Sequence, residues 1–459
     1  MVLGILTTPI LTRLVDPAEY GRFSIFLLYI KIATMVFFLG LDQALVRFYY
    51  KSESLSYKKW LVSSCGKIPF GFSFVVLVFL YFLLVSTSIH FEFRDTFSLL
   101  AIGIYASLIF RLSTLVVRLD NKNKVYSLII IVNKVVYIIL SITLILLPTS
   151  SNFINLAIAH IAGLILASII AIAFTREKFS WNLEKSITYN QDIQELIKYG
   201  LPFIISMGIT TLFQSIDKLF LKFYCDYATV GVYASAASIV SIFSIIQTTF
   251  NTIWGPMMVR HFEKDKDDLD FFVKYNSIIS FVMLLFGLTL VLCKDIFGFL
   301  LGEKYREAAY IVPFLTLEPI MYTVSETTST GIVLKNKSYM NIVVGGVACI
   351  SNAVGNYFLI PILGAKGAAI STGGAYIVFF LLRTIIGNQY LKVNFRLVEF
   401  IAATVIYLLF ASLNSFITFG IWTVAVYLIS VVIVVFLYRD VVRLLIERLL
   451  DMFKRYQHK

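Results

Sequence analysis

Charged residues are scarce in this chain. They make up 14% of its 459 residues, whereas soluble proteins have about 25%. Apolar residues make up 59%, and the mean hydropathy is +0.86. This composition excludes an ordinary soluble domain and indicates a helical membrane protein. The alternating segments of about ten residues that build transmembrane barrels are also lacking.

Cysteine and histidine are sparse, with four residues of each. The cysteines are scattered and form no CxxC pair, so the sequence predicts neither a zinc site nor a disulfide framework. No nucleophile with a neighbouring base and no metal-ligand spacing stands out. We therefore predict no catalytic residues, no metal and no cofactor. A basic start with an A-x-A-like cleavage site is lacking too, so we expect no cleavable signal peptide.

Long apolar segments fill the chain instead. We predict about 14 membrane spans, at about 20 residues each, and hence an all-α polytopic membrane protein. The first segment, near residues 1–12, is too short to cross a bilayer, and Pro17 stops or bends a helix after it.

Lysine and arginine are distributed unevenly between the loops. Most of the 39 residues of these two types fall on the side that would hold both termini, Arg111 and Arg383 among them. Positive loops face the cytoplasm, so we expect both termini there. Nucleic-acid binding is not needed to explain the net charge of +12.

The two halves of the chain repeat one another. DPAEYG at 16–21 matches DYATVG at 226–231 at an offset of 210 residues, and the pair Asn123-Lys124 matches Asn336-Lys337 at an offset of 213. Six spans fit in that distance, so the halves are parallel six-helix repeats, with two further helices at the C-terminal end. The predicted parts are an N-lobe at 1–174, a cytoplasmic linker at 175–198, a C-lobe at 199–386, spans 13 and 14 at 387–438, and a basic cytoplasmic tail at 439–459.

One predicted span, at 22–46, carries charges inside an apolar segment. Lys31 lies near its middle, with Asp42 and Arg47 toward its second end. On one continuous helix, Lys31 and Asp42 are close to three turns apart and share a face. A charge at the bilayer centre costs about 2.5–3.5 kcal/mol on insertion scales, so it faces a partner or a watery cavity. We expect this helix to line a hydrated, basic cavity of a transporter.

Several segments resemble a known family. They are TRLVDPAEYG at 12–21, GLDQALVRFY at 40–49, SIDKLFLKFYCDYATVGVYASA at 215–236 and IPILGAKGAAIST at 360–372. They are similar to the Wzx-type oligosaccharide flippases of polysaccharide biosynthesis, in the MATE-like (MOP exporter) superfamily. The resemblance implies a flippase, not an enzyme, in the bacterial inner membrane. It would move undecaprenyl-pyrophosphate-linked sugar repeats, for O-antigen, capsule or a similar glycan, to the outer leaflet by alternating access. The partners implied are this lipid-linked oligosaccharide, membrane lipids, and a glycan polymerase with chain-length machinery.

An anionic lipid head needs a wet path lined by cations. Lys31, Lys134 and Lys218 supply charge within the spans. Arg47 and Arg260 lie at the cytoplasmic mouth, where ordinary positive-inside anchoring is the other explanation. We also expect Arg13 to hold the head at the outer end of the first span.

Carboxylates inside the spans have two interpretations. Asp42, Asp217, Glu318 and Glu326 would either pair with the cations or carry a coupling proton or sodium ion. For Lys218, beside Asp217, a local structural role is the alternative to substrate binding. Gln214, Gln247, Asn251 and Trp254 would meet the sugars.

Two other functions fit the same composition. A cation-coupled drug or metabolite exporter of the same superfamily would have a cavity dominated by carboxylates and aromatics. A membrane glycan polymerase or ligase would place catalytic groups on a sizeable outer loop, and the predicted outer loops are short. Because the deep charges are mostly lysines, we favour an anionic cargo.

Overall fold

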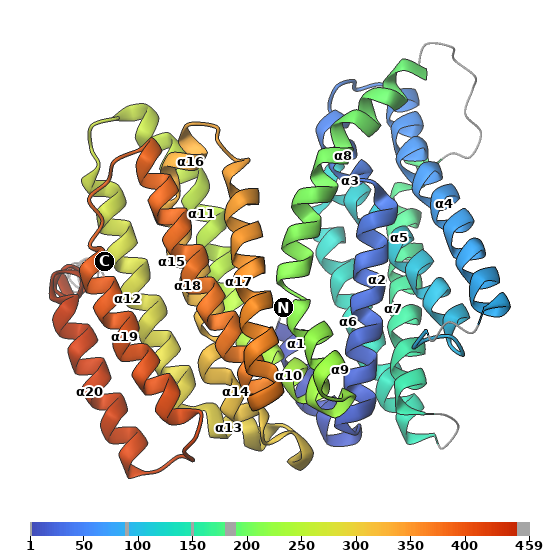
Figure 1. Cartoon of the computed structure of the whole chain (residues 1–459). Helices are drawn as coiled ribbons and strands as arrows, with labels where there is room; N and C mark the ends of the chain where they lie inside the picture. The colour runs from blue at the N-terminus through green and yellow to red at the C-terminus, as the bar shows by residue number, and fades with distance from the viewer. Residues whose placement is uncertain (1, 88–90, 148–150, 180–189, 448–459) are drawn as a thin grey trace, which may run out of the picture. The chain divides into compact units, whose positions relative to one another are not determined.

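The protein is all-helical wherever its chain is described (Figure 1). The structure, a computed structural model, describes residues 2–87, 91–147, 151–179 and 190–447. Every regular element in these ranges is an α-helix or a short 3₁₀-helix.

Eleven helices in the described ranges are long and apolar enough to cross a membrane. Two bent pairs raise the number to 13 if each pair is one span. They are Tyr227–Val240 with Phe243–Lys264, bent by 46°, and Ile421–Leu437 with Arg439–Glu447, bent by 80°. Helix α1 (Val2–Leu14) has only 13 residues, as expected for the short first segment. The predicted polytopic all-α fold is thus confirmed.

The helices form two compact units. The N-unit comprises residues 14–215 and the C-unit comprises residues 1–13 and 216–459. Helices of the N-unit are α2 (Pro17–Phe38), α3 (Leu41–Phe48), α4 (Leu55–Ser86), α5 (Phe97–Leu119), α6 (Asn123–Leu146), α7 (Asn152–Thr175) and α8 (Asn190–Phe213). Helices of the C-unit are α1, α9 (Ile216–Tyr224), α10 (Tyr227–Val240), α11 (Phe243–Lys264), α12 (Asp270–Leu292), α13 (Lys294–Leu300), α14 (Ala308–Leu315), α15 (Leu317–Thr328), α16 (Thr330–Leu334), α17 (Met340–Leu363), α18 (Ala365–Tyr390), α19 (Leu397–Asn414) and α20 (Ile421–Leu437).

The units divide the chain at different residues from the predicted lobes. Helix α1 groups with the C-unit and α8 with the N-unit. Part of the predicted linker, 180–189, lies outside the described residues, as does 448–459 of the predicted tail. The first part of that tail, Arg439–Glu447, is a helix turned away from α20. The lobe and linker boundaries therefore stay predictions.

Local geometry supports the sequence repeat. Asp16 precedes α2 and Asp226 precedes α10, each as the N-cap residue of its helix. Asn121 and Asn336 both adopt left-handed backbone angles, with φ of 57° and 55°. After each asparagine, a lysine N–H donates to the carbonyl five residues back, as in a Schellman motif. The structural match of Asn336 is thus Asn121, two residues before the one aligned from sequence.

Candidate functional site

The predicted span at 22–46 is broken into two helices. Helix α2 ends at Phe38 and α3 begins at Leu41, with Leu39 and Gly40 in left-handed conformations, φ 52° and 71°. A Cβ atom at Gly40 would lie 2.0 Å from the backbone oxygen of Gly200 in α8. The close packing of α8 and the left-handed turn both require glycine here. The three-turn argument that placed Lys31 and Asp42 on one face was therefore wrong, because the helix is not continuous.

Asp42 is buried, and its partner is an arginine of α5. Its side chain is 2% exposed, and the Nε and Nη2 atoms of Arg111 both donate to Oδ2, the former at 3.0 Å. Gln43 donates to the same oxygen at 3.2 Å. Sequence reasoning had assigned Arg111 to the cytoplasmic positive charge. Its place eight residues before the end of the apolar helix α5 was the signal that it lies within a span and not in a loop.

Lys31 is exposed on α2, and its ammonium donates to Oε1 of Gln214 at 3.2 Å. Pro17, the first residue of α2, lies 14 positions away, which is about 21 Å along the helix. That distance is too long for a lysine stem to reach past this end of the helix. Its ammonium thus lies beside an amide that we had expected to meet sugars.

The other predicted cations of the N-unit lie apart from this pair. Arg47 is exposed on α3. Lys134 is exposed on α6, with its ammonium 6.0 Å from the ring centroid of Tyr137. The Tyr137 ring packs edge-on against His160 of α7, at 5.8 Å between centroids. The structure thus places Lys134 at the α6–α7 packing and Lys31 beside α8.

The predicted cations of the C-unit are also dispersed. Arg13 donates through Nε to the backbone oxygen of Leu300 at 3.1 Å, so it fastens α1 to the end of α13. Lys218 is half-buried on α9 and Arg260 is exposed on α11. These three residues thus come from three different helices, α1, α9 and α11.

Asp217 lies at the centre of a polar cluster in the C-unit, 4% exposed. Oδ1 accepts hydrogen bonds from the amides of Asn352 at 2.9 Å and Asn356 at 2.8 Å, both on α17. Oδ2 accepts from Tyr233 of α10 at 2.8 Å and from Thr372 of α18 at 2.9 Å. The expectation that Asp217 pairs with a lysine is not met among the described residues, where its partners are neutral donors.

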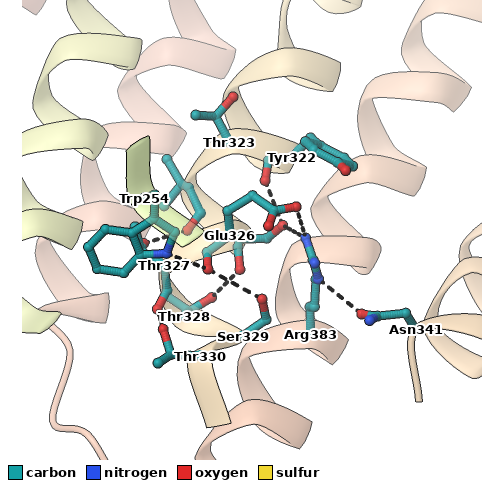
Figure 2. Close-up of polar contacts among 12 residues, drawn as sticks. Trp254, Tyr322, Thr323, Glu326, Thr327, Thr328, Ser329, Thr330, Asn341 and Arg383 are labelled. Atoms are coloured by element: carbon teal, nitrogen blue, oxygen red, sulfur yellow. Dashed lines mark hydrogen bonds and ion pairs between the residues drawn. The ribbon is translucent and has the colours of Figure 1, made fainter. Parts of the chain in front are cut away.

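Two carboxylates on α15 face α18. Tyr376 donates to Glu318 at 3.0 Å. Figure 2 shows Glu326 beside Arg383, whose Nη1 donates to Oε1 of Glu326 at 2.7 Å and to Oγ of Ser325 at 2.9 Å. Glu326 thus partners an arginine of α18 that the sequence analysis had assigned to cytoplasmic charge.

Helices α11 and α17 join the same network. Trp254 of α11 donates to the backbone oxygen of Glu326 at 3.2 Å. The Nε atom of Arg383 donates to Oδ1 of Asn341, on α17, at 3.3 Å (Figure 2). Trp254, expected to meet sugars, is 2% exposed and packs among Phe250, Phe271 and Phe272. A buried indole of this kind holds helices together.

Comparison with known proteins shows which family the chain belongs to. The family model described as "Polysaccharide biosynthesis protein" matches residues 1–262. The chain belongs to this family. Among its relatives, the probable low-salt glycan biosynthesis flippase Agl15 of Haloferax volcanii is 23% identical to this chain over 242 residues. That match covers 52% of this chain and 51% of Agl15, so it spans about half of the relative.

Solved structures with the same fold are transporters. The lipid II flippase MurJ, in an inward closed conformation, aligns with a TM-score of 0.71 at 16% identity, over 98% of this chain and 97% of MurJ. An inward-facing multidrug resistance MATE transporter of the MOP superfamily aligns with a TM-score of 0.55 at 16% identity, over 84% and 93%. At these identities the likeness shows the fold: this polysaccharide biosynthesis protein is a multi-pass membrane protein with a transporter fold.

Proposed function

We propose that the protein flips a lipid-linked glycan, carried on undecaprenyl pyrophosphate, from the cytoplasmic to the outer leaflet by alternating access. The observation that carries the proposal is the flippase-like fold along nearly the whole chain, in a member of a polysaccharide biosynthesis family. The names of two similar proteins, a probable low-salt glycan biosynthesis flippase and a lipid II flippase, support the same class of cargo.

Lys31 is the residue we propose to meet the pyrophosphate. It is exposed within α2, far from the helix start, and its amide partner Gln214 is suited to sugar hydroxyls. An ammonium binds phosphate as a point charge. Arg13, Arg47, Lys134, Lys218 and Arg260 remain candidates for further contacts along the path, and their roles stay proposals.

The Asp217 cluster is our candidate for ion coupling. It gathers both carboxylate oxygens of Asp217 with Oδ1 of Asn356, a buried atom that has no hydrogen-bond partner in the described structure. The donors around Asp217 are neutral, so uptake of a proton or a monovalent cation is what would balance the charge of this buried carboxylate. Because Asp217 contacts α10, α17 and α18 at once, loss of its charge would change how these helices pack.

Deletion of the gene in its host tests the function. We expect loss of the surface glycan and accumulation of the lipid-linked repeat facing the cytoplasm. The wild-type gene should restore the glycan, whereas Lys31→Ala should not, at equal protein level in the membrane. A deletion strain with normal glycan and increased sensitivity to cationic drugs would instead identify an exporter.

Cysteine labelling tests the proposed hydrated path. In a variant without the four native cysteines, a water-soluble thiol reagent should label a cysteine at Lys31. The matched control is Val75 on α4, whose side chain is 66% exposed but lies among the apolar residues of that helix. Equal labelling at both positions would contradict a cavity lined by Lys31.

Asp217→Asn tests coupling separately. If the carboxylate carries the coupling ion, this variant should lose the dependence of flipping on a proton or sodium gradient while it keeps its glycan binding. An unchanged dependence on both gradients would remove Asp217 from the coupling site.

A further inference from the structure

A cavity of about 730 Å³ lies within the N-unit, between α4, α5 and the end of α7. Its wall is mostly apolar and includes Phe70 and Phe74 of α4 and Ile109 of α5. One cation, the exposed Lys67, lines it from α4. None of the residues assigned to glycan transport lines this cavity.

The sequence of α4 explains why the space exists. Pro69, inside the helix, removes a backbone donor and disfavours a straight helix. Before it, Tyr57, Trp60 and Leu61 are buried, and after it most of the large side chains are exposed. Gly71 adds no side chain to the cavity, and a Cβ built there meets nothing within 4 Å. In Figure 1, α4 borders the N-unit beside α5, with which it packs.

The position of Lys67 along α4 predicts how deep its ammonium lies in the membrane. Helix α4 has 32 residues, or about 48 Å, at 1.5 Å per residue, which exceeds a hydrocarbon layer of about 30 Å. Counting back from Ser86, at the apolar end of the helix, Lys67 lies about 28 Å away. Its ammonium is therefore expected at the boundary between hydrocarbon and headgroups, where lipid phosphates lie.

A second polar group, Tyr105 of α5, lies beside Phe70, which is about one helical turn after Lys67 on α4. The Tyr105 ring stacks on Phe70 with centroids 6.1 Å apart and lines the same cavity. Its hydroxyl is buried and has no hydrogen-bond partner among the described residues. A buried hydroxyl without a partner is unfavourable, and a ligand oxygen at this depth would satisfy it.

We infer that this cavity binds one anionic glycerophospholipid of the surrounding membrane. Its phosphate would contact Lys67, an ester oxygen would accept from the Tyr105 hydroxyl, and one acyl chain would fill the space beside Gly71. The cavity of about 730 Å³ has room for one acyl chain.

From Lys67 to Phe74 the cavity presents a cation, then the Tyr105 hydroxyl, then an apolar wall. Phosphate, ester and acyl chain follow one another in the same order in a glycerophospholipid. Basic pockets between membrane helices are a known means of holding anionic headgroups. The inference rests on the N-unit alone and is independent of the glycan cargo, so its failure would leave the proposed function untouched.

Photo-crosslinking of the purified full-length protein tests the site. The probe is phosphatidylglycerol with a photoreactive group in one acyl chain, and phosphatidylcholine with the same group is the comparison. We expect phosphatidylglycerol adducts on Phe70–Phe74 and near Ile109, and several-fold fewer with phosphatidylcholine. Adducts found only on other segments would overturn the inference.

Two variants, each with a matched control, test the charge contact and the space for the acyl chain. Lys67→Gln should weaken phosphatidylglycerol binding about five- to tenfold and remove the preference over phosphatidylcholine, whereas Lys124→Gln, an exposed lysine elsewhere in the N-unit, should not. Gly71→Phe should fill the cavity and abolish the adducts. Its control is Gly374→Phe, because a Cβ at Gly374 also meets nothing within 4 Å.

Tyr105→Phe removes only the hydroxyl and keeps the stacked ring. It should lower adduct yield without changing folding, so it provides a test even if Gly71→Phe does not fold. Unchanged adducts in both Lys67→Gln and Tyr105→Phe would contradict the assigned headgroup contacts.

Discussion

Replacement of Arg383 by methionine should destabilise the C-unit strongly. The arginine is 6% exposed and bonds to Glu326, Ser325 and Asn341. Methionine keeps much of the apolar stem but leaves Glu326, whose side chain is 19% exposed, without its cation. Breaking a buried pair from one side costs about 3–5 kcal/mol, because the remaining charge stays desolvated.

Thermal unfolding in detergent measures this loss. For domains of about 150–250 residues, 1 kcal/mol shifts Tm by about 2–4 °C, so the midpoint should fall by about 6–12 °C for a loss of about 3 kcal/mol. The control is Arg443→Met, which breaks an ion pair whose side chains are 84% and 61% exposed. Exposed pairs contribute about 0–1 kcal/mol, so this Tm should barely move.

A double variant sharpens the test. Replacing Glu326 and Arg383 together by leucine and methionine removes both charges from the protein interior. The double variant should be more stable than Arg383→Met alone, because no unpaired carboxylate remains. If Arg383→Met and Arg443→Met shift Tm equally, the reasoning about the buried pair is refuted.

Two further predictions concern local backbone structure. Gly40→Ala should abolish stable folding of the N-unit, since the new Cβ would overlap Gly200, whereas Gly346→Ala, where a Cβ meets nothing within 4 Å, should leave expression and Tm unchanged. The pKa of Asp226 is lowered, first by the hydrogen bond from the Thr229 backbone and then by its side chain. The Asp226→Ala variant should thus lose about 1 kcal/mol at neutral pH, and the difference from wild type should shrink as pH falls below about 4. A loss in Asp226→Ala that does not vary with pH would contradict the charged cap.

The sequence predicted the helical membrane fold well because span length and apolar composition are local properties. The scarcity of charge, the short first segment and the repeat at Asp16 and Asp226 could all be read without coordinates. The repeat was aligned two residues away from the structural match at Asn336, since identity alone does not reveal a left-handed turn.

The pairing of charges could not be predicted in the same way. A three-turn spacing relates Lys31 to Asp42 only if the helix is continuous, and the left-handed residues Leu39 and Gly40 break it. Arg111 and Arg383 lie within apolar helices, yet loop counting treated them as cytoplasmic anchors. Their carboxylate partners, Asp42 and Glu326, come from distant parts of the chain, and such tertiary contacts have no signature in residue spacing.

The most direct test of the central claim compares glycan flipping by Lys31→Gln, Lys31→Arg and wild-type protein in the deletion strain. The fraction of lipid-linked glycan that faces outward is measured at equal amounts of membrane protein. We predict that Lys31→Gln leaves the glycan on the cytoplasmic leaflet and that Lys31→Arg, which keeps the positive charge, restores part of the outward fraction. Wild-type flipping by Lys31→Gln would contradict a cation at this position as the group that receives the phosphate.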